Sequence, residues 1–127
     1  MYRLIAWCFV LCIILCFAAN AFADTHTAAS CENTTGKFDV QTAVTAADTG
    51  DTVSIPAGTC IWDTKLTVAK NITLSGAGSG VGGTIITGAI DTLIDYTGAT
   101  ASATQTLEIT GMSLTTTSHS GDFNLLS

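Results

Sequence analysis

Positive charge is scarce in this sequence. Arg3 and three lysines are the only basic residues among 127, against ten acidic residues, and the formal net charge is −6. All ten acidic residues follow position 23, so residues 24–127 hold no arginine and carry a formal charge of −7. A surface that binds nucleic acid or an anionic membrane needs basic residues to neutralise phosphate groups. We therefore expect no nucleic-acid partner, and no membrane partner once an N-terminal signal has been removed.

Residues that commonly bind metals or act in catalysis are also few. His26 and His119 are the only histidines, and neither has the spacing to a cysteine that zinc sites use. Asp91 and Asp95 form the closest acidic pair in the strand-rich part of the chain. On one strand they would lie about 13 Å apart, too far to share a calcium ion or to act as a glycosidase pair. We therefore expect no catalytic residue, no metal site and no cofactor.

The one long apolar run lies at the N-terminus. Arg3 supplies a positive charge, and residues 4–19 form an unbroken apolar run of 16 residues, shorter than the about 20 that a spanning helix needs. Ala21 and Ala23 place small residues at positions −3 and −1 of a signal peptidase site, so that Asp24 would begin the mature chain. Residues 1–23 are therefore predicted to be a secretory signal peptide, the alternative being an uncleaved anchor. We expect a secreted protein, which is extracellular, periplasmic or on the cell surface.

Only two of the five cysteines follow the predicted signal peptide. These are Cys31 and Cys60, and an even pair in an exported chain commonly forms a disulfide. The alternative is two buried thiols. We predict a Cys31–Cys60 disulfide, which closes a loop of roughly 30 residues and in the chain-entropy model contributes about 3–4 kcal/mol.

One short amphipathic helix is predicted over residues 38–48, after a polar segment at residues 24–37 that we expect to be irregular. Asp39 is a plausible N-cap, and Gly50 can end the helix in a left-handed conformation. The apolar stripe recurs with helical spacing at Val40, Ala43, Val44 and Ala47.

From residue 52 onward, short runs rich in Val, Ile, Leu and Thr alternate with Gly, Asp and Asn, as half-buried strands require. The Asn-Gly and Asp-Gly pairs that favour tight hairpins are absent from the short breaks. Gly78, Gly80 and Gly83 match a phosphate-binding pattern, but a strand follows them instead of a helix, so we expect a turn. The runs occupy residues 52–55, 59–62, 65–68, 71–74, 84–87, 92–97, 106–115 and 123–126.

This spacing favours a solenoid, because residues 53–72 place three strands within about one turn of a parallel β-helix. We expect three parallel sheets. The first contains residues 52–55, 71–74 and 106–110. The second contains residues 59–62, 84–87 and 123–126, and the third contains residues 65–68 and 92–97. The helix at 38–48 then covers the open first turn, which would otherwise expose strand edges and apolar interior.

The stretches DVQTAVTAADTGDTVSIPAGTCIW and LTVAKNITLSGAG carry a family resemblance. They resemble the N-terminal end of right-handed parallel β-helix proteins of the pectin-lyase-like superfamily, over about residues 31–115. The resemblance implies an all-β fold, a single-stranded solenoid of two to three turns with an N-terminal capping helix, in which residues 38–127 form the cap and the first turns. The matching residues are Ala46, Ala47, Gly50, Asp51, Thr52, Val53, Ile55, Pro56, Ala57, Gly58 and Thr59, then Lys70, Ile72, Thr73, Leu74, Gly76 and Gly78.

Function is less defined, because polysaccharide lyases, hydrolases, adhesins and phage-tail proteins share these turns. A pectate-lyase-like mechanism, as the resemblance implies, needs calcium-binding acids and a basic residue, often arginine. Residues 24–127 have no arginine, and we expect Lys37, Lys65 and Lys70 to be surface charges. Trp62, Tyr96 and Phe123 could stack on sugar rings if they were exposed, but we expect them to lie in the core or a cap. No carbohydrate-binding residue is therefore assigned.

Two functions remain open. The first is an exported β-helix module, structural or carbohydrate-binding, whose partner is a polysaccharide or cell-surface glycan. The second is the N-terminal fragment of a polysaccharide lyase or glycoside hydrolase. Because residues 123–126 have no capping element behind them, we expect the β-helix to be incomplete, with a C-terminal continuation or an oligomer covering that end.

Overall fold

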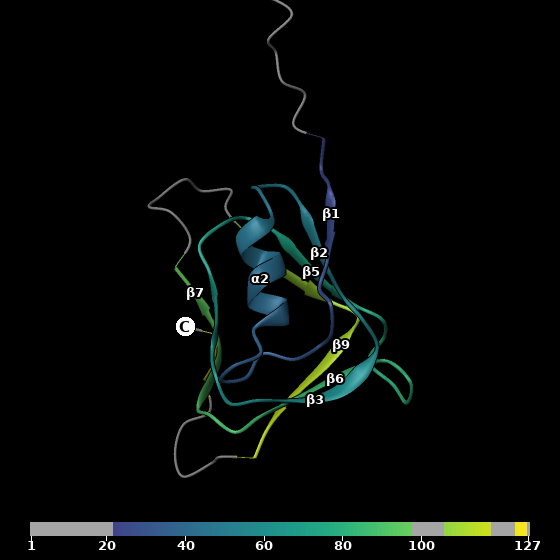
Figure 1. The fold of residues 1–127 in the computed structure, drawn as a ribbon, viewed down its shortest axis with the longest axis vertical. Coiled ribbons are helices and arrows are strands. Elements are labelled where there is room, and N and C mark those ends of the chain that lie inside the picture. Colours follow the sequence, from purple (N-terminus) through teal and green to yellow (C-terminus); the bar gives the residue numbers. More distant parts are fainter. Residues whose placement is uncertain (1–21, 98–105, 118–123, 127) are drawn as a thin grey trace, which may run out of the picture.

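The structure is a computed structural model that describes residues 22–97, 106–117 and 124–126, and it consists mostly of strands with one short helix (Figure 1). The predicted signal peptide lies outside the described residues, apart from residues 22 and 23. Among the described residues, no helix has the length and hydrophobicity needed to cross a membrane. The elements are β1 (Thr25–Thr27), α2 (Asp39–Ala46), β2 (Thr52–Ile55), β3 (Gly58–Trp62), β4 (Leu66–Val68), β5 (Thr73–Gly76), β6 (Thr84–Gly88), β7 (Thr92–Tyr96), β8 (Glu108–Thr110), β9 (Met112–Thr116) and β10 (Asn124–Leu126).

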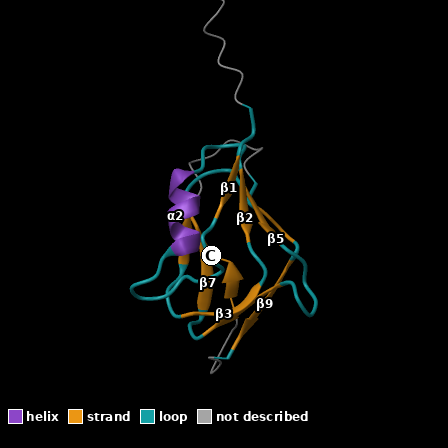
Figure 2. Ribbon diagram, turned by 45° about the vertical axis from the view of Figure 1, so that its right-hand side comes forward, coloured by secondary structure: helices purple, strands orange, loops and turns teal. Residues whose placement is uncertain are grey.

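The strands form three sheets, and every strand pairing among them is parallel. The sheets have the orders β1-β2-β5-β8, β3-β6-β9 and β4-β7-β10. Consecutive strands such as β2, β3 and β4 therefore lie in three different sheets, and each sheet is revisited by the next pass of the chain. Figure 2 shows β1, β2 and β5 side by side, apart from β3 and β9. The predicted mostly-β class with parallel sheets is confirmed.

Alternation of side chains along the strands builds the core. In β3 the side chains of Cys60 and Trp62 are buried while those of Thr59 and Ile61 are exposed. The register also stacks inward residues of successive strands, so that Val53 of β2 pairs with Leu74 of β5. Burial of each such aliphatic side chain contributes about 1.5–3 kcal/mol. The largest fully buried side chains are Trp62, Ile55, Leu66, Leu74, Ile86, Leu93 and Ile94.

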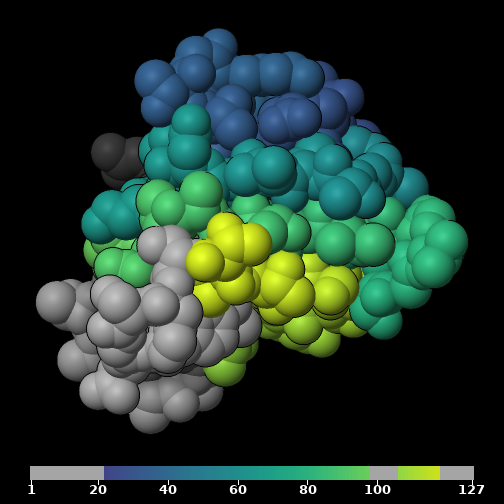
Figure 3. All heavy atoms as spheres, turned by 90° about the horizontal axis from the view of Figure 1, so that it is seen from below, coloured from purple at the N-terminus to yellow at the C-terminus, as the bar shows by residue number. Residues whose placement is uncertain are grey.

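The helix α2 packs against β1, β2 and β4 and buries Val40, Ala43 and Val44. Figure 3 shows bands of colour that follow the sequence, with the N-terminal residues at one end of the molecule. The helix therefore covers the end at which the first strands lie, as expected. This position gives the strand edges and apolar side chains of the first pass a partner in place of water.

Two details of the predicted helix are wrong. Asp39 is the first helical residue, and Phe38 takes the N-cap position. The Asp39 carboxylate instead accepts a hydrogen bond from Ser30 Oγ at 2.6 Å, which anchors the segment before the helix. The helix ends at Ala46 and the chain leaves it extended at Ala47, so Gly50, with φ of 98°, serves a later turn.

Three strand predictions also need correction. The segment 24–37 contains β1, which pairs in register with β2 and is too short to produce a sequence pattern. Residues 106–115 form two strands, because Gly111 turns the chain between them with φ of 63°. The second of these, β9, takes the place in the second sheet that we assigned to residues 123–126, and β10 pairs with β7 in the third sheet.

Candidate functional site

The predicted disulfide is confirmed and fastens the segment before α2 to strand β3. Cys31 and Cys60 are joined with their Cα atoms 5.9 Å apart, and both are buried. The indole of the fully buried Trp62 donates from Nε1 to the Cys31 carbonyl at 2.8 Å. Gly58 leaves the room that the bridge occupies, because an added Cβ there would lie 2.7 Å from Cys31 Sγ. The disulfide, the hydrogen bond from Trp62 and the close packing at Gly58 therefore all fix the N-terminal segment at Cys31.

A second attachment lies beside the disulfide. The fully buried Asn33 donates from Nδ2 to the Thr64 carbonyl at 3.0 Å. Asp63 accepts from the Thr35 amide at 2.7 Å. Its partner is 28 residues away in the chain, so this carboxylate joins two segments.

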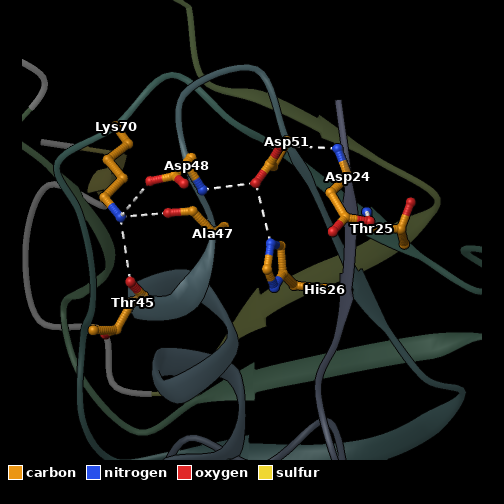
Figure 4. Close-up of polar contacts among 8 residues, drawn as sticks. All are labelled: Asp24, Thr25, His26, Thr45, Ala47, Asp48, Asp51 and Lys70. Atoms are coloured by element: carbon orange, nitrogen blue, oxygen red, sulfur yellow. Dashed lines mark hydrogen bonds and ion pairs between the residues drawn. The ribbon is translucent and has the colours of Figure 1, made fainter. Parts of the chain in front are cut away.

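The most concentrated polar cluster of the capped end is centred on Asp51, which is 5% exposed (Figure 4). One carboxylate oxygen accepts from the Asp24 amide at 2.9 Å. The other accepts from the Asp48 amide at 2.7 Å and lies 3.1 Å from His26 Nε2. The amide donors of Asp24 and Asp48, helped by His26 and opposed by burial, lower the pKa of Asp51 below its ordinary value. Asp51 thus holds β1 against the turn that precedes β2.

Lys70 occupies the C-terminal end of α2 (Figure 4). Its Nζ donates to the Thr45 carbonyl at 3.2 Å and to the Ala47 carbonyl, and lies 3.8 Å from an Asp48 carboxylate oxygen. A cation at this position satisfies free helical carbonyls and interacts favourably with the helix dipole. Sequence reasoning treated Lys70 as a surface charge. The contact spans more than 20 residues, so no local pattern marks it.

The other two lysines also form ion pairs with aspartates. Lys65 Nζ lies 2.5 Å from Asp95, and Lys37 Nζ lies 3.7 Å from Asp39. Each of these lysines is partly exposed, as expected for surface charges. Asp95 therefore has Lys65 as its ion-pair partner.

A shallow hollow of about 290 Å³ adjoins the Asp51 cluster. It contains three carboxylates and an imidazole, yet within residues 22–97, 106–117 and 124–126 no group of three or more His, Cys, Asp or Glu side chains is placed to hold a metal ion. Its chemistry is that of an acceptor site for N–H donors. The lining residues are Phe22, Asp24, His26, Asp48, Thr49 and Asp51.

The remaining sequence candidates lie apart from this cluster. Tyr96 is partly buried and donates from its hydroxyl to Asn71 Oδ1 at 2.7 Å, while Phe123 and His119 lie outside the described residues. The glycine-rich stretch forms the turn between β5 and β6, closed by the Thr84 amide donating to the Gly78 carbonyl at 2.8 Å. The expectation of a turn there is confirmed.

The outer surface of the sheet β1-β2-β5-β8 carries two rows of mostly hydroxyl side chains, which we call the hydroxyl face. They alternate with inward residues such as Val53 and Leu74, and neighbouring strands place them about 4.8 Å apart. The pattern is not visible in any one strand, because each contributes only two of the positions. One row pairs Thr25, Thr52, Thr73 and Glu108, and the other pairs Thr27, Ser54, Ser75 and Thr110.

Comparisons with known proteins yielded no match to any family model, curated protein or solved structure.

Proposed function

We propose that this chain is an exported structural module that forms the capped N-terminal end of a right-handed parallel β-helix. The observation that carries the proposal is the order in which the chain visits its sheets. Each pass contributes one strand to each of three parallel sheets, and successive passes stack in register. This is the repetition expected of a solenoid, in which each turn buries its apolar side against the next.

The attachments at the N-terminal end support the structural role. A solenoid end that is not covered exposes strand edges and apolar interior, which promotes association with other chains. Here α2 covers that end and is fixed at its N-terminal side by Ser30 and at its C-terminal side by Lys70. The disulfide adds a covalent link that an oxidising, extracytoplasmic compartment would favour.

The export part of the proposal is tested with the native leader. The full chain is produced in a bacterium with a periplasm, and the fractions are analysed by intact mass under non-reducing conditions. We expect a periplasmic or secreted product with the mass of residues 24–127 and no free thiol. Retention of the 127-residue chain in the cytoplasm would contradict export.

A neutral polysaccharide or cell-surface glycan is the partner that we propose for the hydroxyl face. Its regular hydroxyl rows offer donors and acceptors to sugar hydroxyls, and its low content of basic residues disfavours a polyanionic glycan. Sedimentation of the mature chain with insoluble neutral polysaccharides tests this role. Ser54→Lys/Ser75→Lys should abolish binding, whereas Thr59→Lys/Thr67→Lys on the other sheets should retain it. Equal binding by both variants would remove the hydroxyl face as the binding surface.

The second candidate, a fragment of a polysaccharide lyase or glycoside hydrolase, has weaker support. Residues 24–127 contain no arginine, and Lys37, Lys65 and Lys70 each pair with an aspartate. We expect the mature chain to release no unsaturated product from polyuronates with calcium. Measurable release would favour this candidate.

A further inference from the structure

Asp24 has two properties that the sequence and the fold reveal separately. It directly follows the Ala21-Phe22-Ala23 stretch that resembles a signal peptidase site. In the fold, its backbone nitrogen donates to the buried Asp51 carboxylate at 2.9 Å (Figure 4). The atom that cleavage would convert into a free amino group is therefore already in contact with a buried acid.

The charges around this contact are unbalanced before cleavage. Asp24, Asp48 and Asp51 bring three carboxylates to the cluster, and His26 is their neighbour from β1. The nearby cation, Lys70, lies 3.8 Å from the exposed Asp48 carboxylate and is engaged with helix carbonyls. Asp51 is thus a buried carboxylate that receives amide hydrogen bonds and one imidazole contact. Buried charges are normally paired with an opposite charge, and among the described residues the imidazole of His26 is the one such neighbour of Asp51.

We propose that removal of the leader completes this cluster by forming an ion pair between the new α-amino group of Asp24 and the carboxylate of Asp51. The proposal rests on the export function above, because it requires a host signal peptidase. The enzyme hydrolyses the Ala23–Asp24 amide. The water oxygen bonds to the Ala23 carbonyl carbon as the C–N bond breaks, so that the leader ends in a carboxylate. The Asp24 nitrogen is released as an amine, which takes up the protons of that water molecule and becomes an ammonium group. The uncleaved leader therefore prevents this ion pair from forming.

The geometry keeps the new group in place. The Asp24 carbonyl accepts from the Thr52 amide at 2.8 Å, and β1 follows in register with β2. The residue is therefore fixed on both sides of its α-carbon, and the ammonium forms where the amide now donates. A free α-amino group is mostly protonated near neutral pH, since its ordinary pKa is about 7.7–8.0. The change replaces a neutral hydrogen bond with a charge-assisted one, which is stronger.

Defined N-termini test the ion pair without any need for export. A synthetic peptide thioester of residues 24–30 can be joined to residues 31–127 at Cys31, with the disulfide formed afterwards. Three mature chains are compared: one with a free Asp24 amine, one with that amine acetylated, and one extended by Ala23. The acetylated chain keeps the amide donor and removes only the charge. The extension keeps the donor and moves the charge by one residue.

We expect the free-amine chain to unfold about 4–8 °C above both controls at pH 6 and low salt, the size of shift that a modest ion pair gives in a domain of this length. In an Asp51→Asn background the three chains should unfold together. Equal midpoints for the three chains, or a difference that survives Asp51→Asn, would overturn the ion pair while leaving export intact.

A second measurement does not depend on that variant folding. With ¹⁵N at the Asp24 amine, the titration midpoint in the folded chain should lie above that of the free 24–30 peptide. The Asp51 carboxylate faces the amine, and the three carboxylates of Asp24, Asp48 and Asp51 outnumber the two basic side chains nearby, His26 and Lys70. An unshifted midpoint overturns the ion pair. Separately, an exported protein whose first residue is not Asp24 overturns the processing step.

Discussion

Gly76 and Gly111 meet backbone to backbone at the corner where the chain passes from β8 to β9. A Cβ added to Gly111 would lie 2.5 Å from the Gly76 carbonyl oxygen, and one added to Gly76 would lie 2.3 Å from the Gly111 carbonyl oxygen. The Gly78 amide donates to that same Gly111 carbonyl at 2.7 Å. Successive passes of the chain are thus in contact at this corner because neither residue has a side chain.

Substitution of Gly111 by alanine should destabilise the chain by more than the cost of placing a non-glycine residue at a positive φ angle. Positive φ costs a non-glycine residue about 1–2 kcal/mol, and the clash with Gly76 adds to this. Gly36→Ala serves as the strain-only control, since its φ is 93° and an added Cβ meets no heavy atom of the described residues within 4 Å. At Gly80 the φ angle is not positive and an added Cβ meets no described heavy atom within 4 Å, so Gly80→Ala should leave the stability almost unchanged. Urea unfolding midpoints should fall in the order Gly80→Ala, Gly36→Ala, Gly111→Ala, and equal losses at Gly36 and Gly111 would remove the clash from the argument.

The sequence predicts the strands well where the side-chain alternation is local. Residues 52–55 alternate Thr, Val, Ser and Ile, and the observed strand β2 has these bounds. The prediction fails at residues 106–115, because the apolar positions change phase at Gly111, from 107 and 109 to 112 and 114, and we treated both parts as one run although the chain turns there. The first sheet was assigned correctly for β2, β5 and β8. Because that corner was missed, β10 was assigned to the second sheet, in the place that β9 occupies, and the third sheet was left without it.

The candidate site was much less accessible to sequence reasoning. The disulfide followed from counting cysteines, and the apolar stripe of α2 followed from helical spacing. In contrast, Asp51 accepts from Asp24 and Lys70 donates to Thr45, and these partners are more than 20 residues apart. Such contacts depend on which residues successive passes place side by side, which a single sequence does not reveal.

Lys70→Met should destabilise the capped end by about 0.3–1 kcal/mol, because the last carbonyls of α2 lose a cationic donor. Lys37→Met is a matched control, since the Lys37 side chain forms a 3.7 Å ion pair with Asp39 at the surface and such pairs contribute little. Urea unfolding at low and high salt measures both. A loss at Lys37 equal to that at Lys70 would argue against a capping role.

Acid should weaken the fold through Asp51. Because the folded state lowers its pKa from the ordinary 3.8, Asp51 contributes stability that is fully present above that value. This contribution is lost as the pH falls through the lower folded pKa. Thermal midpoints of the mature chain between pH 6 and pH 2 should therefore fall more steeply than those of Asp51→Asn, which should start several degrees lower at pH 6. Asp91→Asn, at an exposed position, should follow the parent chain. Parallel curves for Asp51→Asn and the parent would contradict the assignment.

Removal of the disulfide should cost about 3–4 kcal/mol, the loop-closure contribution for a separation of 29 residues. The double variant Cys31→Ala/Cys60→Ala avoids a lone reactive thiol and leaves the Cys31 carbonyl available to Trp62. Its urea midpoint should match that of the parent chain under reducing conditions. Free thiols in the native, unreduced protein, detected by alkylation and mass spectrometry, would contradict the bridge.

Thr84 links two passes through one buried hydroxyl. Its Oγ1 accepts from the Ala77 amide at 2.8 Å and lies 3.1 Å from the carbonyl oxygens of both Ile55 and Pro56. Thr84→Val keeps the shape but leaves the amide and these carbonyls without that partner, which should cost about 1–3 kcal/mol.

Thr59→Val is the control for this change, because the exposed Thr59 lies on the neighbouring strand β3 and undergoes the same substitution. It should leave the urea midpoint within about 0.5 kcal/mol of the parent chain. Native-state hydrogen exchange adds a local readout, since the Ala77 amide should lose protection in Thr84→Val and keep it in Thr59→Val. If Thr84→Val is as stable as Thr59→Val, the hydroxyl is replaceable by packing, and the join between β2 and β6 rests on apolar contacts alone.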